Sequence, residues 1–283
     1  MAFEYTIKYI SENFYDSQVH KAVWQFIIIP ETNDSQELIK MDIIASINSK
    51  IEKSINGFGF QAIRVYSEKS FENFKVEAHF KVIKQEINPF GFLPSETIED
   101  DYETVESLGF KADYESYLTN TSLTRLSKKY LKLYLFDKGK SIMDNLIDLN
   151  TWVYNYIHFK TAVTDVKTLL DDIIVNRQGV CQDFSHLFIA LARLNKIPTR
   201  YVSGYLHQGD GFFGDSQMHA WVEAYIPNIG WIGFDPTNNL LANHNHIKVS
   251  HGKDYNDCPP LKGIIYSPGS NETKHSVEVT YQQ

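Results

Sequence analysis

The apolar residues in the first 90 positions follow a period of two, which restricts that part of the chain to β-strands. In the run 3–9, aromatic and aliphatic side chains alternate with polar ones, and the run 75–82 repeats the pattern. Strict alternation is typical of strands that bury one face. No catalytic residue types are concentrated in this region. Residues 1–90 are therefore predicted to form a β-rich N-terminal domain with a packing or accessory role.

The period changes to that of an α-helix in the second part of the chain. Residues 123–134 and, more clearly, 142–157 place apolar side chains at helical spacing. Between the two regions, residues 91–118 are rich in Asp and Glu, with Lys111 as the base among them. Such a charge run predicts a solvated or mobile acidic connector, or else a recruitment site for a basic partner. Residues 119–283 are then expected to form the second domain.

The charge balance argues against two broad classes of partner. Lys and Arg total 27 against 35 Asp and Glu, which gives a net charge of −8. A general nucleic-acid binder needs a basic face, and adhesion to an anionic membrane needs one as well. Neither nucleic acid nor a membrane is expected as a partner. Two cysteines and a start without signal-peptide character predict a cytoplasmic protein.

Cys181 opens a segment with a clear helical face. Gly179 permits a tight turn just before it, and Lys196-Ile197-Pro198 ends the segment because the residue before a proline avoids helical space. The first turn of a helix favours an anion and lowers a thiol pKa. A thiolate is a strong nucleophile for acyl chemistry. The alternative is that Cys181 is a small buried apolar residue.

Two later runs predict a β-hairpin that carries a histidine and an aspartate. Residues 218–226 alternate, residues 227–230 form a turn, and residues 231–235 return. Antiparallel pairing would bring His219 and Asp235 together, because their positions allow the same face of adjacent strands. A base oriented by a carboxylate, facing a cysteine at a helix start, is the arrangement used in cysteine acyl transfer.

The three motifs together resemble the bacterial transglutaminase-like superfamily. They are Gly179-Val180-Cys181-Gln182-Asp183-Phe184, Met218-His219-Ala220-Trp221-Val222-Glu223 and Gly233-Phe234-Asp235-Pro236-Thr237-Asn238. The likeness is strongest from 165 to 263 and includes His246-Ile247-Lys248-Val249. The N-terminal half is similar to the β-rich module that often precedes this core in bacterial members.

The resemblance implies a papain-like α+β core in which a catalytic helix packs against an antiparallel sheet. By motif match it implies Cys181 as nucleophile, His219 as general base and acid, and Asp235 as the residue that orients the imidazole. In such a site the Cys181 N–H is a candidate oxyanion donor, while a second donor is not evident from the sequence. No cofactor is implied. Met218 replaces the serine common in the family, and its side chain should point away from His219.

Several other residues are candidates for binding the substrate or for surrounding the three site residues. Tyr201, Trp221 and Trp231 are candidate substrate-binding residues, although core packing explains the two tryptophans equally well. Asp183 and Glu223 are expected to be hydrogen-bond partners or surface groups. The glycines of the segment 209–214 predict a mobile loop over the cleft.

A metal site is not predicted, because its possible ligands have no compact zinc spacing and look like loop residues. These possible ligands are His244, His246, His251 and Cys258.

Three functions remain open at this point. A cysteine hydrolase, either peptidase or amidase, would release the acid from a thioester acyl-enzyme to water. A transamidase would pass the same acyl group to an amine. A binding or assembly protein would keep the fold without turnover. The substrate expected for the first two is a protein or peptide, hydrolysis is favoured over crosslinking, and the sequence leaves the oligomeric state open.

Overall fold

The alternating N-terminal run forms one long strand, β1 (Ala2–Val19), in a computed structural model that describes all residues except 48, 89–90, 92–97, 208–216 and 283. Strand β1 pairs with β6 (Phe71–Gln85) on one side and with β15 (Asn271–Gln282) on the other. Strand β3 (Gln36–Ala45) completes this four-stranded antiparallel sheet beside β6. The inward side chains of the two predicted runs are buried, as the period of two predicts.

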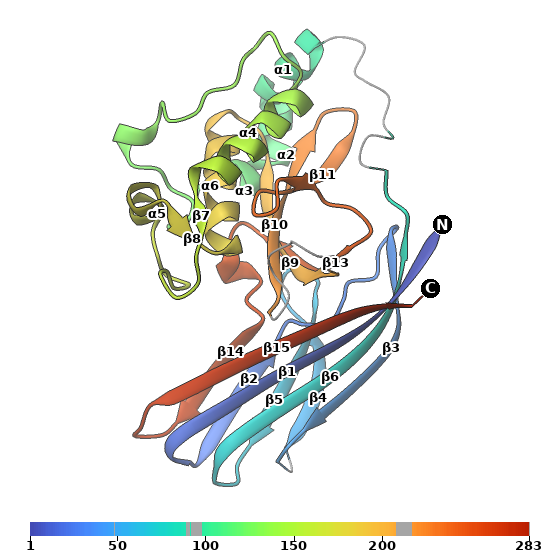
Figure 1. The fold of residues 1–283 in the computed structure, drawn as a ribbon, viewed down its shortest axis with the longest axis vertical. Helices are drawn as coiled ribbons and strands as arrows, with labels where there is room; N and C mark the ends of the chain where they lie inside the picture. Colours follow the sequence, from blue (N-terminus) through green and yellow to red (C-terminus); the bar gives the residue numbers. More distant parts are fainter. Residues whose placement is uncertain (48, 89–90, 92–97, 208–216, 283) are drawn as a thin grey trace.

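A second four-stranded sheet faces the first (Figure 1). Its strands, in spatial order, are β14 (Leu261–Tyr266), β2 (Lys21–Phe26), β5 (Gln61–Ser67) and β4 (Lys50–Ile55). Aromatic side chains fill the space between the sheets: Trp24 of β2 stacks on Phe74 of β6, with ring centroids 3.7 Å apart. We call these two sheets the β module.

The β module differs from the predicted division of the chain. Two of its strands, β14 and β15, come from the C-terminal end that the sequence pattern assigned to the domain 119–283. The module therefore consists of residues from both ends of the chain, and the two termini lie close together in Figure 1. Pairing between strands that lie far apart in the sequence leaves no local sequence pattern, because each strand shows only its own alternation of apolar and polar residues.

The remaining residues form a core domain around a five-stranded antiparallel sheet. The spatial order is β12 (Leu240–Leu241), β11 (Gly230–Asp235), β10 (His219–Ile226), β9 (Thr199–Leu206) and β13 (His246–Gly252). Helix α6 (Cys181–Leu194) packs on β9 and β10, and α4 (Ile142–Tyr156) packs on α6. The predicted α+β class, with a helix packed on an antiparallel sheet, is confirmed.

Shorter elements connect these layers. Helix α5 (Leu170–Asn176) precedes α6, and β7 (His158–Phe159) and β8 (Gln178–Gly179) form a small parallel pair. A 3₁₀ turn, η2 (Tyr255–Asp257), follows β13. The predicted start of the helix at 142 is confirmed by its cap, since Asp144 N–H donates to Ser141 Oγ at 3.0 Å.

The acidic connector is folded where the structure describes it. It forms three short helices, α1 (Ile98–Glu106), α2 (Leu108–Asp113) and α3 (Glu115–Leu118). Val105 of α1 is fully buried in the apolar cluster of the core domain. Glu103, Glu106, Asp113 and Glu115 are exposed, as a solvated acidic face predicts. Asp101, in contrast, is 4% exposed, so residues 101–118 pack against the core domain and are not solvated throughout.

The helix expected over residues 123–134 is absent from this described segment, which contains only the 3₁₀ turn η1 (Lys128–Tyr130). The buried guanidinium of Arg193 on α6 explains the irregular path. It donates hydrogen bonds of 2.9 to 3.1 Å to backbone and hydroxyl oxygens of residues 117–124. Leu126 and Leu133 of this irregular segment instead pack against the apolar cluster of the core domain.

The β module and the core domain share apolar surface. Tyr205 of β9 and Ile247 and Val249 of β13 lie within the buried cluster of the β module. The Tyr205 hydroxyl donates to the Ile28 carbonyl at 2.6 Å. The module is therefore joined to the core sheet by a continuous apolar interface. Among the described residues, no helix is long and apolar enough to cross a lipid bilayer.

Candidate active site

Cys181 is the first residue of α6, where a buried carboxylate fixes the start of the helix. Asp183 Oδ2 accepts hydrogen bonds from the Val180 N–H at 2.8 Å and from Thr164 Oγ1 at 2.6 Å. Gly179 is required here, because a Cβ at that position would lie 2.5 Å from the same oxygen. Asp183 is thus a hydrogen-bond partner within the helix start, one of the two roles predicted for it.

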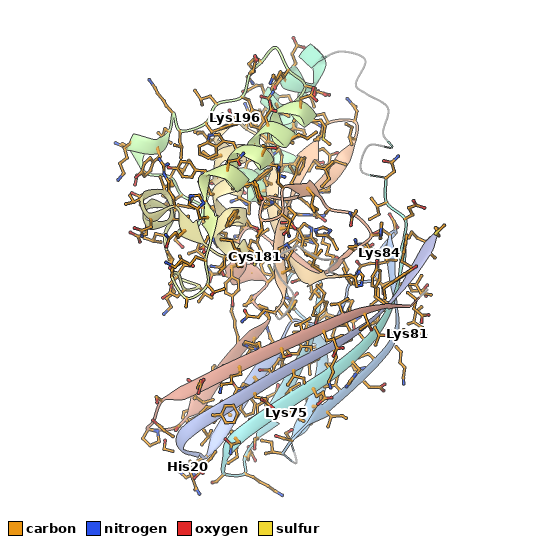
Figure 2. All side chains as sticks on the ribbon, viewed as in Figure 1. His20, Lys75, Lys81, Lys84, Cys181 and Lys196 are labelled. Atoms are coloured by element: carbon orange, nitrogen blue, oxygen red, sulfur yellow. The ribbon has the colours of Figure 1, made fainter. Side chains whose placement is uncertain are left out.

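This position leaves the Cys181 thiol partly exposed at the end of α6 that meets the β module (Figure 2). The first N–H groups of a helix have no acceptor within the helix. Together with the macrodipole, they favour negative charge near the first turn. A thiolate or an oxyanion is therefore stabilised at this point.

His219 and Asp235 meet as the hairpin parity predicts. His219 begins β10, Asp235 ends β11, and Nε2 of the imidazole lies 2.8 Å from Oδ2 of the carboxylate. Both side chains are fully buried. In this contact Nε2 donates its proton to the carboxylate, so Nδ1 is the nitrogen left to face the thiol.

The electrostatics of the pair favour a charged imidazole. Burial alone opposes the charge, but the Asp235 carboxylate, its hydrogen bond and the contact with Cys181 raise the pKa of His219 to about 10. Among the described residues, His219 Nδ1 has no hydrogen-bond partner, which leaves this nitrogen available to the Cys181 thiol. The arrangement therefore suits a thiolate–imidazolium pair between Cys181 and His219.

Asp235 is held by a set of donors around both of its oxygens. Oδ1 accepts from the N–H groups of Thr237 at 3.0 Å and Asn238 at 3.3 Å. Oδ2 accepts from the Asn238 side-chain amide at 2.8 Å and from His246 Nε2 at 3.2 Å. Burial opposes the carboxylate, yet the two imidazoles and these hydrogen bonds hold the pKa of Asp235 well below its usual range.

His246 is the residue of this site that the sequence reasoning missed. It starts β13, it is 2% exposed, and its Nδ1 accepts the Asn243 N–H at 3.2 Å. An imidazole whose Nδ1 is an acceptor carries its proton on Nε2 when neutral, so His246 donates to Asp235. Burial lowers the pKa of His246, which keeps it neutral.

His246 and His251 were expected in a loop, but both lie on β13. The alternation of residues 246–250 after the asparagine-rich turn was the available signal for a strand. The residues whose possible ligand atoms lie close together also differ from the set His244, His246, His251 and Cys258. The donor atoms of His219, Asp235 and His246 lie within 4.8 Å of one another. His219 and His246 each donate the Nε2 proton to Asp235 Oδ2, so all three atoms already have hydrogen-bond partners.

A cavity of about 700 Å³ opens beside Cys181 and His219. One wall belongs to the core domain and includes Tyr201, Ser203 and Gln182. The opposite wall belongs to the β module, with residues of β1, β2, β14 and β15. The candidate site therefore lies between the two parts of the molecule. The loop expected over the cleft, with its glycines at 209, 211 and 214, lies outside the described residues.

Residues 133–236 match the family model of the transglutaminase-like superfamily. The chain therefore carries a transglutaminase-like domain over these residues. Uncharacterised proteins of Mycobacterium tuberculosis and Mycobacterium leprae are similar to it, with 36% identity over 141 residues and 38% over 133 residues. The matches cover 47% and 46% of this chain and 45% and 47% of those relatives, so the chain spans about half the length of each.

The chain also shares its whole fold with a solved structure. A candidate cysteine protease from Cytophaga hutchinsonii matches 100% of this chain over 92% of its own, with a TM-score of 0.81 and 24% sequence identity. This likeness concerns the fold. It shows that the β module and the core domain occur together in another protein with the same arrangement.

The structure places the three predicted substrate-binding residues in two different cavities. Tyr201 lines the 700 Å³ cavity, but Trp221 and Trp231 line a second cavity of about 410 Å³. Trp221 packs against His246, with ring centroids 5.2 Å apart, and Trp231 stacks under Arg200.

The placement of Trp231 follows from the strand rise. Trp231 pairs with Tyr225, six residues beyond His219 and so about 20 Å along the strand. Trp221 lies two residues from His219 on β10, with ring centroids 6.2 Å apart, but it lines the second cavity and not the one beside Cys181. Glu223 also lies on this side, where it is paired with Arg200 at 2.6 Å and Lys248 at 2.8 Å.

Proposed function

We propose that this protein is a cysteine hydrolase that cleaves amide bonds through a thioester acyl-enzyme. The observation that carries the proposal is the buried His219–Asp235 pair at 2.8 Å, whose imidazole lines the same cavity as Cys181 at the first turn of α6. Nucleophile, base and orienting carboxylate are the three groups that cysteine acyl transfer needs.

The chemistry follows from the positions of these groups. His219 Nδ1 takes the thiol proton, and the Cys181 thiolate adds to the carbonyl carbon of the amide. The resulting tetrahedral intermediate breaks its C–N bond while His219 returns the proton to the leaving amine, which leaves a thioester on Cys181. Water then adds to the thioester with His219 as base, and the acid leaves as the thiol is restored.

The oxyanion of the tetrahedral intermediate needs donors, and two candidates border the thiol. The first is the backbone N–H of Cys181 at the helix start. The second is the Tyr201 hydroxyl: Tyr201 is 3% exposed in the cavity wall, and burial and the nearby Cys181 raise its pKa well above the ordinary value. The phenol therefore stays neutral and keeps the proton that a donor must offer.

Hydrolysis is proposed over amine transfer because the cavity beside Cys181 is large enough to admit water to the thioester. The cysteine protease role ascribed to the Cytophaga hutchinsonii protein of the same fold supports the same choice. The discriminating measurement is the fate of the acyl group with and without an added primary amine.

The test uses intact-protein mass spectrometry with an activated peptide ester. The wild type should gain the acyl mass and lose it in water, whereas Cys181→Ala should gain none. Cys258→Ala is the matched control, because Cys258 is fully buried and does not line the cavity, and it should acylate like the wild type.

Undiminished turnover by a folded Cys181→Ala protein would overturn the mechanism. Dominant transfer of the acyl group to the amine would replace hydrolysis by transamidation. A wild type that neither acylates nor reacts with iodoacetamide would favour a binding protein.

A further inference from the structure

The wall of the cavity opposite Cys181 is formed by the edge of the β module. Strands β14 and β15 are the outermost strands of its two facing sheets, both at the same side of the module. Leu261, Gly263 and Ile265 of β14 and Thr273 and His275 of β15 line the cavity. The space between the two sheets is thus continuous with the space beside the thiol.

The floor of this groove is aromatic and lies deep between the sheets. Tyr15 of β1 and Trp24 of β2 line the same cavity, although each is less than 9% exposed. Gly263 leaves space next to the indole on the β14 side, since a Cβ there would lie 3.0 Å from Trp24 Cδ1. A larger residue at 263 would press on the indole and narrow the groove.

The polar groups of the groove are uncharged and already ordered. Thr273 Oγ1 donates to Asn13 Oδ1 at 2.9 Å, and the Tyr9 hydroxyl lies 3.2 Å from His275 Nδ1. Among the described residues that line the cavity, Asp165 is the only one from the Lys, Arg, Asp and Glu set. The groove thus favours neutral segments, and Asp165 disfavours acidic ones by like-charge repulsion.

The unpaired sides of β14 and β15 give the groove a further property. Each offers backbone N–H and C=O groups on its outer side, which can pair with an extended chain. Among the described strands, β14 pairs only with β2, and β15 only with β1. An extended polypeptide can therefore satisfy these groups while its side chains enter the groove alternately.

We propose that the β module is the substrate-binding element of the enzyme, and that the groove between β14 and β15 holds an extended, uncharged polypeptide segment of the acyl donor. This inference rests on the proposed function, because it requires that Cys181 is acylated. It replaces the accessory role predicted for the N-terminal domain: the module selects the substrate, and the core domain performs the chemistry.

The experiment compares two acyl donors with the same reactive ester: a single blocked amino acid, and a neutral peptide of several residues ending in that amino acid. The variant is Ile265→Trp, which fills the groove. The matched control is Ile264→Trp on the opposite face of the same strand, where the side chain is 66% exposed. Thermal denaturation of all three proteins checks that the fold is retained.

The wild type should prefer the peptide ester in kcat/KM, and Ile265→Trp should reduce that preference by about tenfold or more, a typical effect of altering a specificity pocket. Ile264→Trp should keep the wild-type preference. Equal reactivity of the two esters in the wild type, with no change in Ile265→Trp, would overturn the inference and leave the proposed function standing. Failure of both esters to acylate Cys181 would remove the proposed function, and this inference with it.

Discussion

His246 offers the most specific perturbation of the candidate site. Its Nε2 donates to Asp235 Oδ2 at 3.2 Å, and the shared oxygen is the one that also accepts from His219. His246→Ala removes a donor from a fully buried carboxylate. A hydrogen bond to a charged group contributes about 1.5–3 kcal/mol, which corresponds to roughly a 10- to 150-fold change in an equilibrium or rate.

We expect this loss in kcat for acylation, with KM little changed, because His246 faces Asp235 and does not line the 700 Å³ cavity. A Gln side chain can place an amide donor near the position of Nε2, so His246→Gln should recover part of the rate. Stopped-flow acylation with an activated ester measures both parameters, and circular dichroism checks the fold. A folded His246→Ala protein with wild-type kcat would refute the claim that His246 positions Asp235.

The remaining predictions concern the cysteines, the pH dependence and the β module. Iodoacetamide should alkylate Cys181 in the folded protein but not Cys258, which is buried and whose pKa is raised by that burial; peptide mapping shows which thiol reacts. Because the pKa of His219 is raised from 6.5 to about 10, its stabilising effect is full below pH 6.5 and lost as the pH rises through about 10. The melting temperature should therefore fall between about pH 6.5 and pH 10 by more in the wild type than in Asp235→Asn. Deletion of residues 1–90 should yield an insoluble or unfolded chain, because it exposes Tyr205, Ile247 and Val249, and a soluble, cooperatively melting fragment would contradict this.

Local patterns in the sequence were sufficient for the parts of the molecule whose contacts are local. Alternation located β1 and β6, and a turn followed by an apolar helical face located α6 with Cys181 at its start. The hairpin parity of His219 and Asp235 predicted their contact, since only three residues separate the two strands. The fold class followed from these elements.

Features that depend on distant segments could not be derived in this way. His246 contacts Asp235 although two strands separate β13 from β11 in the sheet, and no spacing rule predicts that contact. The irregular segment after α3 depends on hydrogen bonds from Arg193, which lies about 70 residues later. The positions of Trp221 and Trp231 required the register of β10 and β11 as well as their parity.

The pairing of β15 with β1 has a consequence for how the protein folds. Thr280 and Thr6 face each other across β1 and β15 although they are 274 positions apart. During synthesis, the outer edge of β1 stays open until residues 271–282 have emerged, whereas the contacts of the core domain can form earlier. Contacts between such distant residues form slowly, and open strand edges promote aggregation in the interval. Strand β15 is therefore made long after β1, whose edge it protects.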